Sequence, residues 1–271
     1  LEFPAMLTIL NFNPVEGYNF TFDPRLSFLN EQNQRIMSMQ LSARYGLASS
    51  RFFLKGSFRR ILNEYNRTFF RLEGGKYIDQ YNAGAIKEWL NSIYSVFWET
   101  SYMNLYHHSY GKISWGRELF NGFNMRMQAY YGHRGPLYNS SDINNQFVDS
   151  ENRSFQPNNN LNISVNNRPS LIAKQVAATT SIYITYRPGA KHMERPDRKV
   201  SLGSKYPLFK IRYQRGWAGI MDSKSNFDHL WGSISDNLNL GIMGNLRWKV
   251  GAGWFINNEF VGFADQKYFN T

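Results

Sequence analysis

Short segments in which apolar and strongly polar residues alternate recur along the chain, and they constrain its fold more than any other feature. Residues 209–214 read FKIRYQ, and residues 242–250 repeat the alternation, with Leu246 and Trp248 on one parity and Arg247 on the other. Because successive side chains of a strand point to opposite faces, each segment predicts a sheet with one apolar and one charged face. This alternation is typical of an antiparallel transmembrane β-barrel.

The composition excludes a helical membrane protein and agrees with the barrel. Aromatic residues make up 17% of the 271 residues, and the 17 tyrosines and 21 phenylalanines are spread through the predicted strands. That spread fits aromatic girdles at two membrane surfaces. The mean hydropathy is −0.51, and no run reaches the roughly 20 apolar residues of a membrane helix.

The formal charge of +11 is distributed as single Lys and Arg residues at alternate strand positions and in loops. A nucleic-acid binder gathers such residues on one patch or helix, so we expect no nucleic-acid partner. Basic residues that line a barrel interior or meet anionic lipid head groups fit the scatter better. Cysteine is absent, which excludes disulfides and thiolate metal sites.

The pattern predicts about ten strands, give or take two, which is an arc of a larger barrel. Residues 113–131 are too long for one unbroken crossing, and Gly116 and Gly122 are places for bends. The last strands are predicted near residues 230–240, 242–250 and 254–263.

Two segments break the strand pattern. Between residues 83 and 108 the apolar residues are spaced by three and four, which predicts an amphipathic helix inserted among the strands. We expect it to pack against the end of the barrel or inside its mouth, while an interfacial membrane helix and a gating element remain open. Residues 138–175 are polar and rich in Asn, which predicts a long surface loop.

Motifs for catalysis, cofactors or metals are missing, so we predict no enzyme, no cofactor and no metal site. The adjacent pair His107 and His108 would diverge on a helix and could not share a metal. Asp222 and Asp228 lack the spacing of a calcium loop. The remaining enzyme hypothesis, a hydrolase, rests on His133 near Asp142 without a nucleophile motif.

Charged residues in or beside the strands are the better functional signal. Burying them in lipid would cost several kcal/mol, so they are expected to face the barrel interior or to pair with one another. Two interpretations remain open: a structural network that fixes strand register and holds a plug, which is favoured, or a path or gate for anionic solute. The residues concerned are Glu16, Arg117, Glu118, Arg134, Arg212, Arg215 and Arg247.

Several local strings, taken in order, add a resemblance to one family. They are residues 11–17 (NFNPVEG), 101–106 (SYMNLY), 117–122 (RELFNG), 133–139 (HRGPLYN), 204–209 (SKYPLF), 213–217 (YQRGW) and 263–270 (FADQKYFN). Together they resemble the barrel region of a Bacteroidota outer-membrane β-barrel family of unknown function whose members carry an N-terminal carboxypeptidase-regulatory-like domain. Pro14 departs from the family's usual Thr and removes a backbone donor, so the strand there is expected to bend or to lie at an edge.

The resemblance implies that residues 1–271 are an outer-membrane barrel region. It also implies an upstream signal peptide and a small regulatory-like β-sandwich that lie outside this chain, and further strands after Asn270. The regulatory-like domain is a non-catalytic sandwich, so the family name does not imply a peptidase.

The first hypothesis is therefore a non-enzymatic outer-membrane barrel of a Gram-negative cell envelope that acts as a scaffold or passage in a larger assembly. Its expected partners are outer-membrane lipid, including lipopolysaccharide, and other envelope proteins. The alternative is a component of the machinery that inserts or secretes proteins at the outer membrane.

Overall fold

The computed structural model describes residues 2, 9–82, 86–141, 155–158, 174–194 and 199–266. Its strands are β1 (Leu10–Asn13), β2 (Gly17–Phe22), β3 (Arg25–Leu29), β4 (Arg35–Gly46), β5 (Arg51–Asn63), β6 (Thr68–Gln80), β7 (Leu105–Phe120), β8 (Phe123–Pro136), β9 (Gln175–Tyr186), β10 (Lys191–Glu194), β11 (Lys199–Gly203), β12 (Leu208–Gly216), β13 (Asn226–Asn239) and β14 (Asn245–Phe260). The helices are α2 (Glu88–Trp98) and the 3-10 turns η1 (Ile220–Asp222), η2 (Gly241–Met243) and η3 (Phe263–Asp265).

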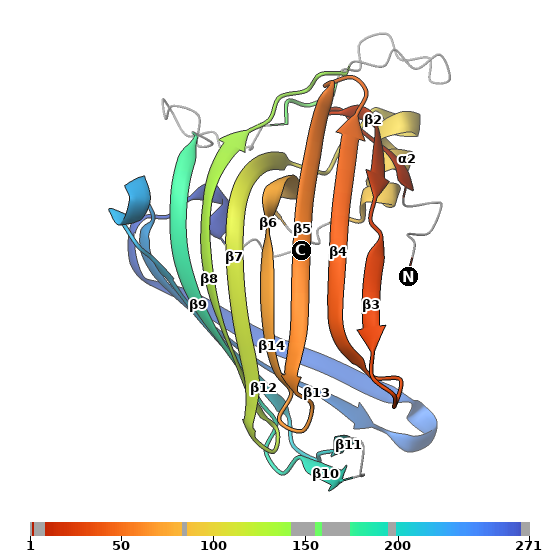
Figure 1. Ribbon diagram of the computed structural model, residues 1–271, viewed down its shortest axis with the longest axis vertical. Helices are drawn as coiled ribbons and strands as arrows, with labels where there is room; N and C mark the ends of the chain where they lie inside the picture. The colour runs from red at the N-terminus through yellow and green to blue at the C-terminus, as the bar shows by residue number, and fades with distance from the viewer. Residues whose placement is uncertain are drawn as a thin grey trace.

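Twelve of the strands form one antiparallel sheet in the order β1-β2-β4-β5-β6-β7-β8-β9-β12-β13-β14, with β3 also paired to β4. Strands β10 and β11 form a separate two-stranded antiparallel sheet. The large sheet is strongly curved, so that β12, β13 and β14 pass behind β4 to β8 (Figure 1). Such curvature gives the sheet a concave inner face and a convex outer face.

Cross-strand register assigns each side chain to one of these faces. On β8 and β12, Arg134 and Gln214 both contact Asp265, which follows β14, so their parity marks the inner face. On β5, Lys55 and Ser57 share that face, whereas Leu54 lies on the outer face, because directly paired residues point the same way. The sheet is thus charged inside and apolar outside, as the alternation predicts.

Helix α2 is shorter than the predicted segment of residues 83–108, since strand β7 already begins at Leu105. His107 and His108 therefore lie on a strand and point to opposite faces, which corrects their placement at a helix end. Residues 83–85 lie outside the described residues. The spacing of apolar residues by three and four correctly predicted a helix. The predicted helix was too long because apolar residues at the start of β7 continue the same spacing by chance.

Other boundaries differ for local reasons. The residues 113–131 belong to two strands, β7 and β8, because Gly122 has a φ of 82° and turns the chain. The predicted strands at residues 242–250 and 254–263 are largely one strand, β14, which runs through Gly251 and Gly253. Most of the predicted loop at 138–175 lies outside the described residues.

A small hydrophobic core joins the sheet to the segments that cover one end of its inner face. Its buried members are Val15, Phe53, Tyr77, Ile78, Met103, Leu105 and Leu137. They come from the β1–β2 turn, from the strands β5, β6 and β7, and from the connections next to them, so this core fixes the N-terminal hairpin against the sheet. The turn itself bends after Asn13, where Pro14 was expected to disturb the strand.

The prediction of a mostly antiparallel, all-β chain interrupted by a helix is confirmed. The described strands do not close into a barrel, since β1 and β14 are the ends of the sheet. No helix among the described residues is both long and apolar enough to cross a membrane.

A glycine at the β5–β6 pairing provides a test of the sheet. Gly75 has a φ of 142°, and a Cβ atom there would lie 2.3 Å from the carbonyl oxygen of Leu54. We expect Gly75→Ala to lower the free energy of unfolding by about 1–3 kcal/mol, since backbone must shift. Urea unfolding followed by tryptophan fluorescence measures the change.

Gly56→Ala is the matched control, because a Cβ atom at Gly56 meets no atom within 4 Å. We expect it to change the free energy of unfolding by less than about 0.5 kcal/mol. Equal losses in the two variants would contradict the paired register of these strands.

Candidate functional site: a basic cluster on the inner face

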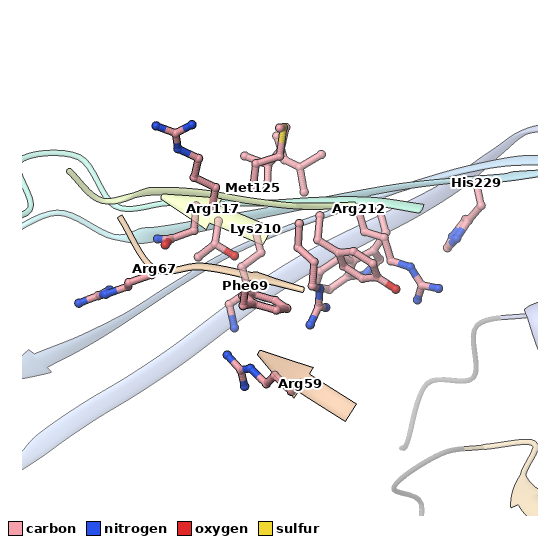
Figure 2. Close-up of a pocket in the computed structure, with 15 residues that line it drawn as sticks. Arg59, Arg67, Phe69, Arg117, Met125, Lys210, Arg212 and His229 are labelled. Atoms are coloured by element: carbon pink, nitrogen blue, oxygen red, sulfur yellow. The ribbon is translucent and has the colours of Figure 1, made fainter. Parts of the chain in front are cut away.

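Besides Arg117, whose side chain points to the outer face, five cationic side chains gather at one cavity of the curved sheet. They are Arg59 on β5, Arg67 in the β5–β6 turn, Arg126 on β8, and Lys210 and Arg212 on β12, and are called the basic cluster below. Figure 2 shows Arg59 and Phe69 on one side of the sheet, whereas Met125 and Arg117 point away from them on the other. The cavity has a volume of about 600 Å³.

Strand register brings the cluster together from distant parts of the sequence. Arg126, Tyr183 and Arg212 are directly paired neighbours on β8, β9 and β12. Paired residues on adjacent strands share a face, so the three side chains form a row across the sheet. Trp231 on β13 extends the row beyond Arg212.

Aromatic rings hold the arginines of this row. The Cζ atoms of Arg126 and Arg212 lie 4.2 Å and 5.1 Å from the centroid of the Tyr183 ring. Arg59 lies over the ring of Phe69 at 4.4 Å. A ring face attracts a guanidinium without neutralising it, so the positive charge of the cluster remains available.

The described residues place no carboxylate in this cavity. No Asp or Glu among them lines it, and Arg59, Arg126, Lys210 and Arg212 form no ion pair with any of them. Arg212 donates to Gln214, yet its Nε atom is buried without a hydrogen-bond partner. Arg67 alone approaches an acid, with 3.8 Å between its Nε atom and Glu118 Oε2. The lining of the cavity therefore carries an excess of positive charge, and this charge is held on paired strands.

Elsewhere on the inner face, charges are buried and paired. Arg44 is 5% exposed and lies between Glu16 and Glu88, with 3.0 Å from its Nε atom to Glu16 Oε1. Asn13 completes the arrangement by donating to Glu16 Oε2 and accepting from the backbone N–H of Glu16. Because Glu88 opens α2, this group ties the helix and the β1–β2 turn to β4.

Arg134 ties the end of the chain to the inner face. Its Nη1 and Nη2 atoms donate to the two carboxylate oxygens of Asp265 at 2.6 Å and 3.1 Å. Tyr81 and Tyr106 pack with Phe263 beside this pair, and burial raises the pKa of Tyr81. The hydrogen bonds between Arg134 and Asp265 hold the turn η3 against the concave side of the sheet.

A polar chain leads from β6 to this tie. His108 Nε2 lies 3.1 Å from Asp79 Oδ2, and His108 Nδ1 lies 3.2 Å from the hydroxyl of Tyr130. The same hydroxyl accepts a hydrogen bond of 3.3 Å from Arg134 Nε. An Asp–His pair can orient a nucleophile in hydrolases, but here Tyr130 and the ring of Tyr110, stacked at 4.0 Å, occupy both free sides of the imidazole.

The seven charged residues expected to form one network lie in separate places. Glu16 and Arg134 belong to the two buried ties, and Glu118 is buried beside Lys199 and accepts from the backbone N–H of Gly122. Arg212 belongs to the basic cluster, and Arg247 is exposed on β14.

Two of the seven lie on the outer face, which corrects their expected orientation. Arg117 follows the parity of Ile113, and Arg215 pairs with Asp228 next to the end of β12. Arg117 could not share a face with its neighbour Glu118, because adjacent strand residues point in opposite directions. The hydroxyl of Tyr213 also donates to Asp228, so this carboxylate is already occupied by protein partners.

Sequence reasoning missed Arg44, Asp79, Arg59, Arg126 and Lys210 as site residues. Arg126 and Lys210 stand in strand segments whose alternation is evident, so parity relative to Arg212 was a usable signal for them. The partners of Arg44 and Asp79 come from segments far along the chain, and no local pattern shows such pairings. Among the described residues, no group of three or more potential ligands could hold a metal. Asp142, the expected partner of His133, lies outside the described residues.

The fold and this site define an all-β protein with a curved antiparallel sheet, an apolar outer face and a charged inner face. The chain belongs to the family of unknown function DUF5686, because the profile of that family's C-terminal domain matches residues 1–271. Comparison with curated proteins and with solved structures gives no match.

The tie between Arg134 and Asp265 can be tested by a double-mutant cycle. These side chains are 9% and 3% exposed, so Arg134→Gln leaves an uncompensated buried carboxylate and is expected to lower the free energy of unfolding by about 3–5 kcal/mol. The double variant with Asp265→Asn should lose less than the sum of the single losses. Chemical denaturation of the four proteins measures the coupling.

Arg247→Gln is the control, because it also removes an arginine from the inner face. Arg247 is exposed, so we expect this variant to change the free energy of unfolding by less than about 0.5 kcal/mol. Additive losses in the cycle would show that Arg134 and Asp265 are not coupled.

Proposed function

We propose that this chain forms a wall section of a β-barrel in the outer membrane of a Gram-negative bacterium, of the Bacteroidota by the resemblance above. It acts there without catalysis, as a scaffold or passage in a larger envelope assembly. Its partners are outer-membrane lipid, including lipopolysaccharide, and other envelope proteins, and an upstream regulatory-like sandwich belongs to the same protein.

The observation that carries the proposal is the apolar outer face. Large apolar side chains are exposed over strands from both ends of the sheet, far beyond the patches that a protein in water normally shows. Alternation with a charged inner face is what lipid on one side and water on the other require. These outer side chains include Phe20, Leu26, Met39, Leu41, Leu54, Leu72, Ile113, Met127, Ile211, Leu230, Ile234, Leu246, Val250, Trp254 and Ile256.

Helix α2 supports the same surroundings, because its polar side is the buried one. Asn91 and Ser95 are buried, and Asn91 accepts a hydrogen bond from the backbone N–H of Tyr102. Trp89, Ile93 and Phe97 share the opposite side and are each at least 40% exposed. A helix that turns aromatic and aliphatic residues outward fits the interfacial region of a bilayer, one of the alternatives that the sequence left open.

The interior supports a scaffold with a partly filled lumen. The N-terminal turn, α2 and η3 are fixed to the inner face by buried ion pairs, and the basic cluster lines the cavity that remains. A charge buried in a protein is stable only when it is paired with an opposite charge, and the charges at the two ties are paired in this way. The structural interpretation of the charges is thus favoured at the ties, and the passage interpretation at the basic cluster.

Single-cysteine labelling tests the proposal, since the chain has no cysteine. Leu54→Cys and Ser57→Cys place a thiol on the outer and inner faces of β5. In intact outer membranes, we expect a water-soluble maleimide to modify the Ser57 variant at least about tenfold faster, because lipid excludes the reagent and suppresses the thiolate. Labelling is measured by the mass shift of the protein.

Unfolding in urea with detergent supplies the control, because both thiols should then react at similar rates. Leu54 is 41% exposed in the structure, so a chain that worked in water would label readily at this position in its native state. Fast labelling of the Leu54 variant in membranes, or recovery of the protein in the aqueous fraction without detergent, would refute the proposal.

A further inference from the structure

The basic cluster holds positively charged side chains close to one another on neighbouring strands. Arg59 and Arg71 are directly opposite on β5 and β6, a pairing that destabilises a sheet when both residues carry the same charge. Arg71 is neutralised by Glu73, with 2.7 Å between Arg71 Nη2 and Glu73 Oε2, whereas Arg59 contacts the ring of Phe69 and pairs with no acid among the described residues. Glu73 thus lies two positions along β6 from Arg71 and neutralises it, but Glu73 does not pair with any cation of the basic cluster.

The geometry of the arginines favours a particular anion. A guanidinium stacked on a ring keeps its N–H edge free, and this edge matches the oxygens of a phosphate in a two-bond arrangement. Arg126 and Arg212 both stack near Tyr183 and lie two strands apart, a separation of about 10 Å at the usual strand spacing. Both guanidinium groups lie against the Tyr183 ring, so a phosphate at the inward edge of this ring can accept from the N–H groups of both.

The rest of the lining limits what carries the phosphate. The rings of Phe69, Tyr183 and Trp231 line the cavity beside the cations, so its wall is partly apolar and suits a phosphate carried on a compact organic scaffold. A cavity of about 600 Å³ accommodates a small organic molecule. Five cations without a lining acid favour more than one negative charge on the ligand.

We propose that the basic cluster is a binding site for a phosphorylated organic anion, with Arg126 and Arg212 holding a phosphate over Tyr183 and Arg59, Arg67 and Lys210 supplying further charge. The phosphate can belong to a free solute or to the head group of a phosphorylated lipid. Binding by this site depends on the inner face alone and does not require that the outer face contact a membrane.

Calorimetry of the full chain in detergent micelles tests the site with glucose 1,6-bisphosphate as the probe and glucose as the neutral control. We expect binding of the bisphosphate only, with an affinity that falls as NaCl is added. The variant Arg126→Gln/Arg212→Gln should bind at least about tenfold more weakly, because charged hydrogen bonds to the phosphate are lost. Absence of binding to the unmodified chain would overturn the proposal.

Two further variants separate the site from general charge and from folding. Arg60→Gln removes the same charge from the outer face beside Arg59 and should leave the affinity unchanged. Lys210→Gln changes an exposed side chain that holds no other residue, so it should lower the affinity severalfold even if the double arginine variant fails to fold. Equal losses in the Arg60 and Lys210 variants, or unchanged affinity in the Lys210 variant, would overturn the site.

Competition identifies the source of the phosphate. Micelles that contain phosphatidic acid displace the bisphosphate if the site takes lipid head groups, and micelles that contain phosphatidylcholine are the matched control. Displacement by phosphatidic acid alone supports a lipid ligand, and retention of the bisphosphate supports a free solute. Equal displacement by both lipids would overturn recognition of the phosphate by the arginines.

Discussion

The rest of the structure depends on the pairing register of the long strands. Each strand alternates between two environments, and register determines which residues of neighbouring strands stand in one row. A slip of one residue between β8 and β9 would carry Arg126 away from Tyr183 and turn Ile182 or Ile184 towards the charged interior. The apolar outer face and the basic cluster are therefore two consequences of the same pairing.

Charged side chains on the inner face have two kinds of neighbours, which are carboxylates at one end of the sheet and aromatic rings at the other. At one end, Arg44 and Arg134 are buried and each is matched by carboxylates from segments that cover the sheet. Such pairs add little net stability compared with apolar packing, but they strongly disfavour any arrangement that separates the partners. They specify where α2 and η3 sit. At the other end, aromatic rings instead of carboxylates lie against the cations.

Periodic patterns in the sequence predicted the strands and the helix, but the sequence did not predict contacts between residues that lie far apart along the chain. Alternation identified the antiparallel strands, and three-and-four spacing identified α2, because both signals are local. The interpretation of His107 and His108 failed because aromatic residues at the start of β7 imitate helical spacing over one turn. The predicted single network failed at Arg117 and Arg215, where parity, applied strictly, assigns both residues to the outer face. Pairings such as Arg134 with Asp265 span 131 positions and depend on the curvature of the whole sheet.

An unneutralised cluster is informative because the same sheet neutralises comparable groups. Glu73 reaches Arg71 and Lys112, and Glu118 reaches Lys199, so the chain has acids at suitable rows of its inner face. Repulsion among Arg59, Arg126 and Arg212 therefore acts in the folded state alone, and an anion that binds there relieves it. Ligand binding and folding are linked by this relief, because a ligand that binds only the folded state adds its binding free energy to the stability of the sheet. The positive charge that weakens this part of the sheet is the same charge that would hold the proposed anion.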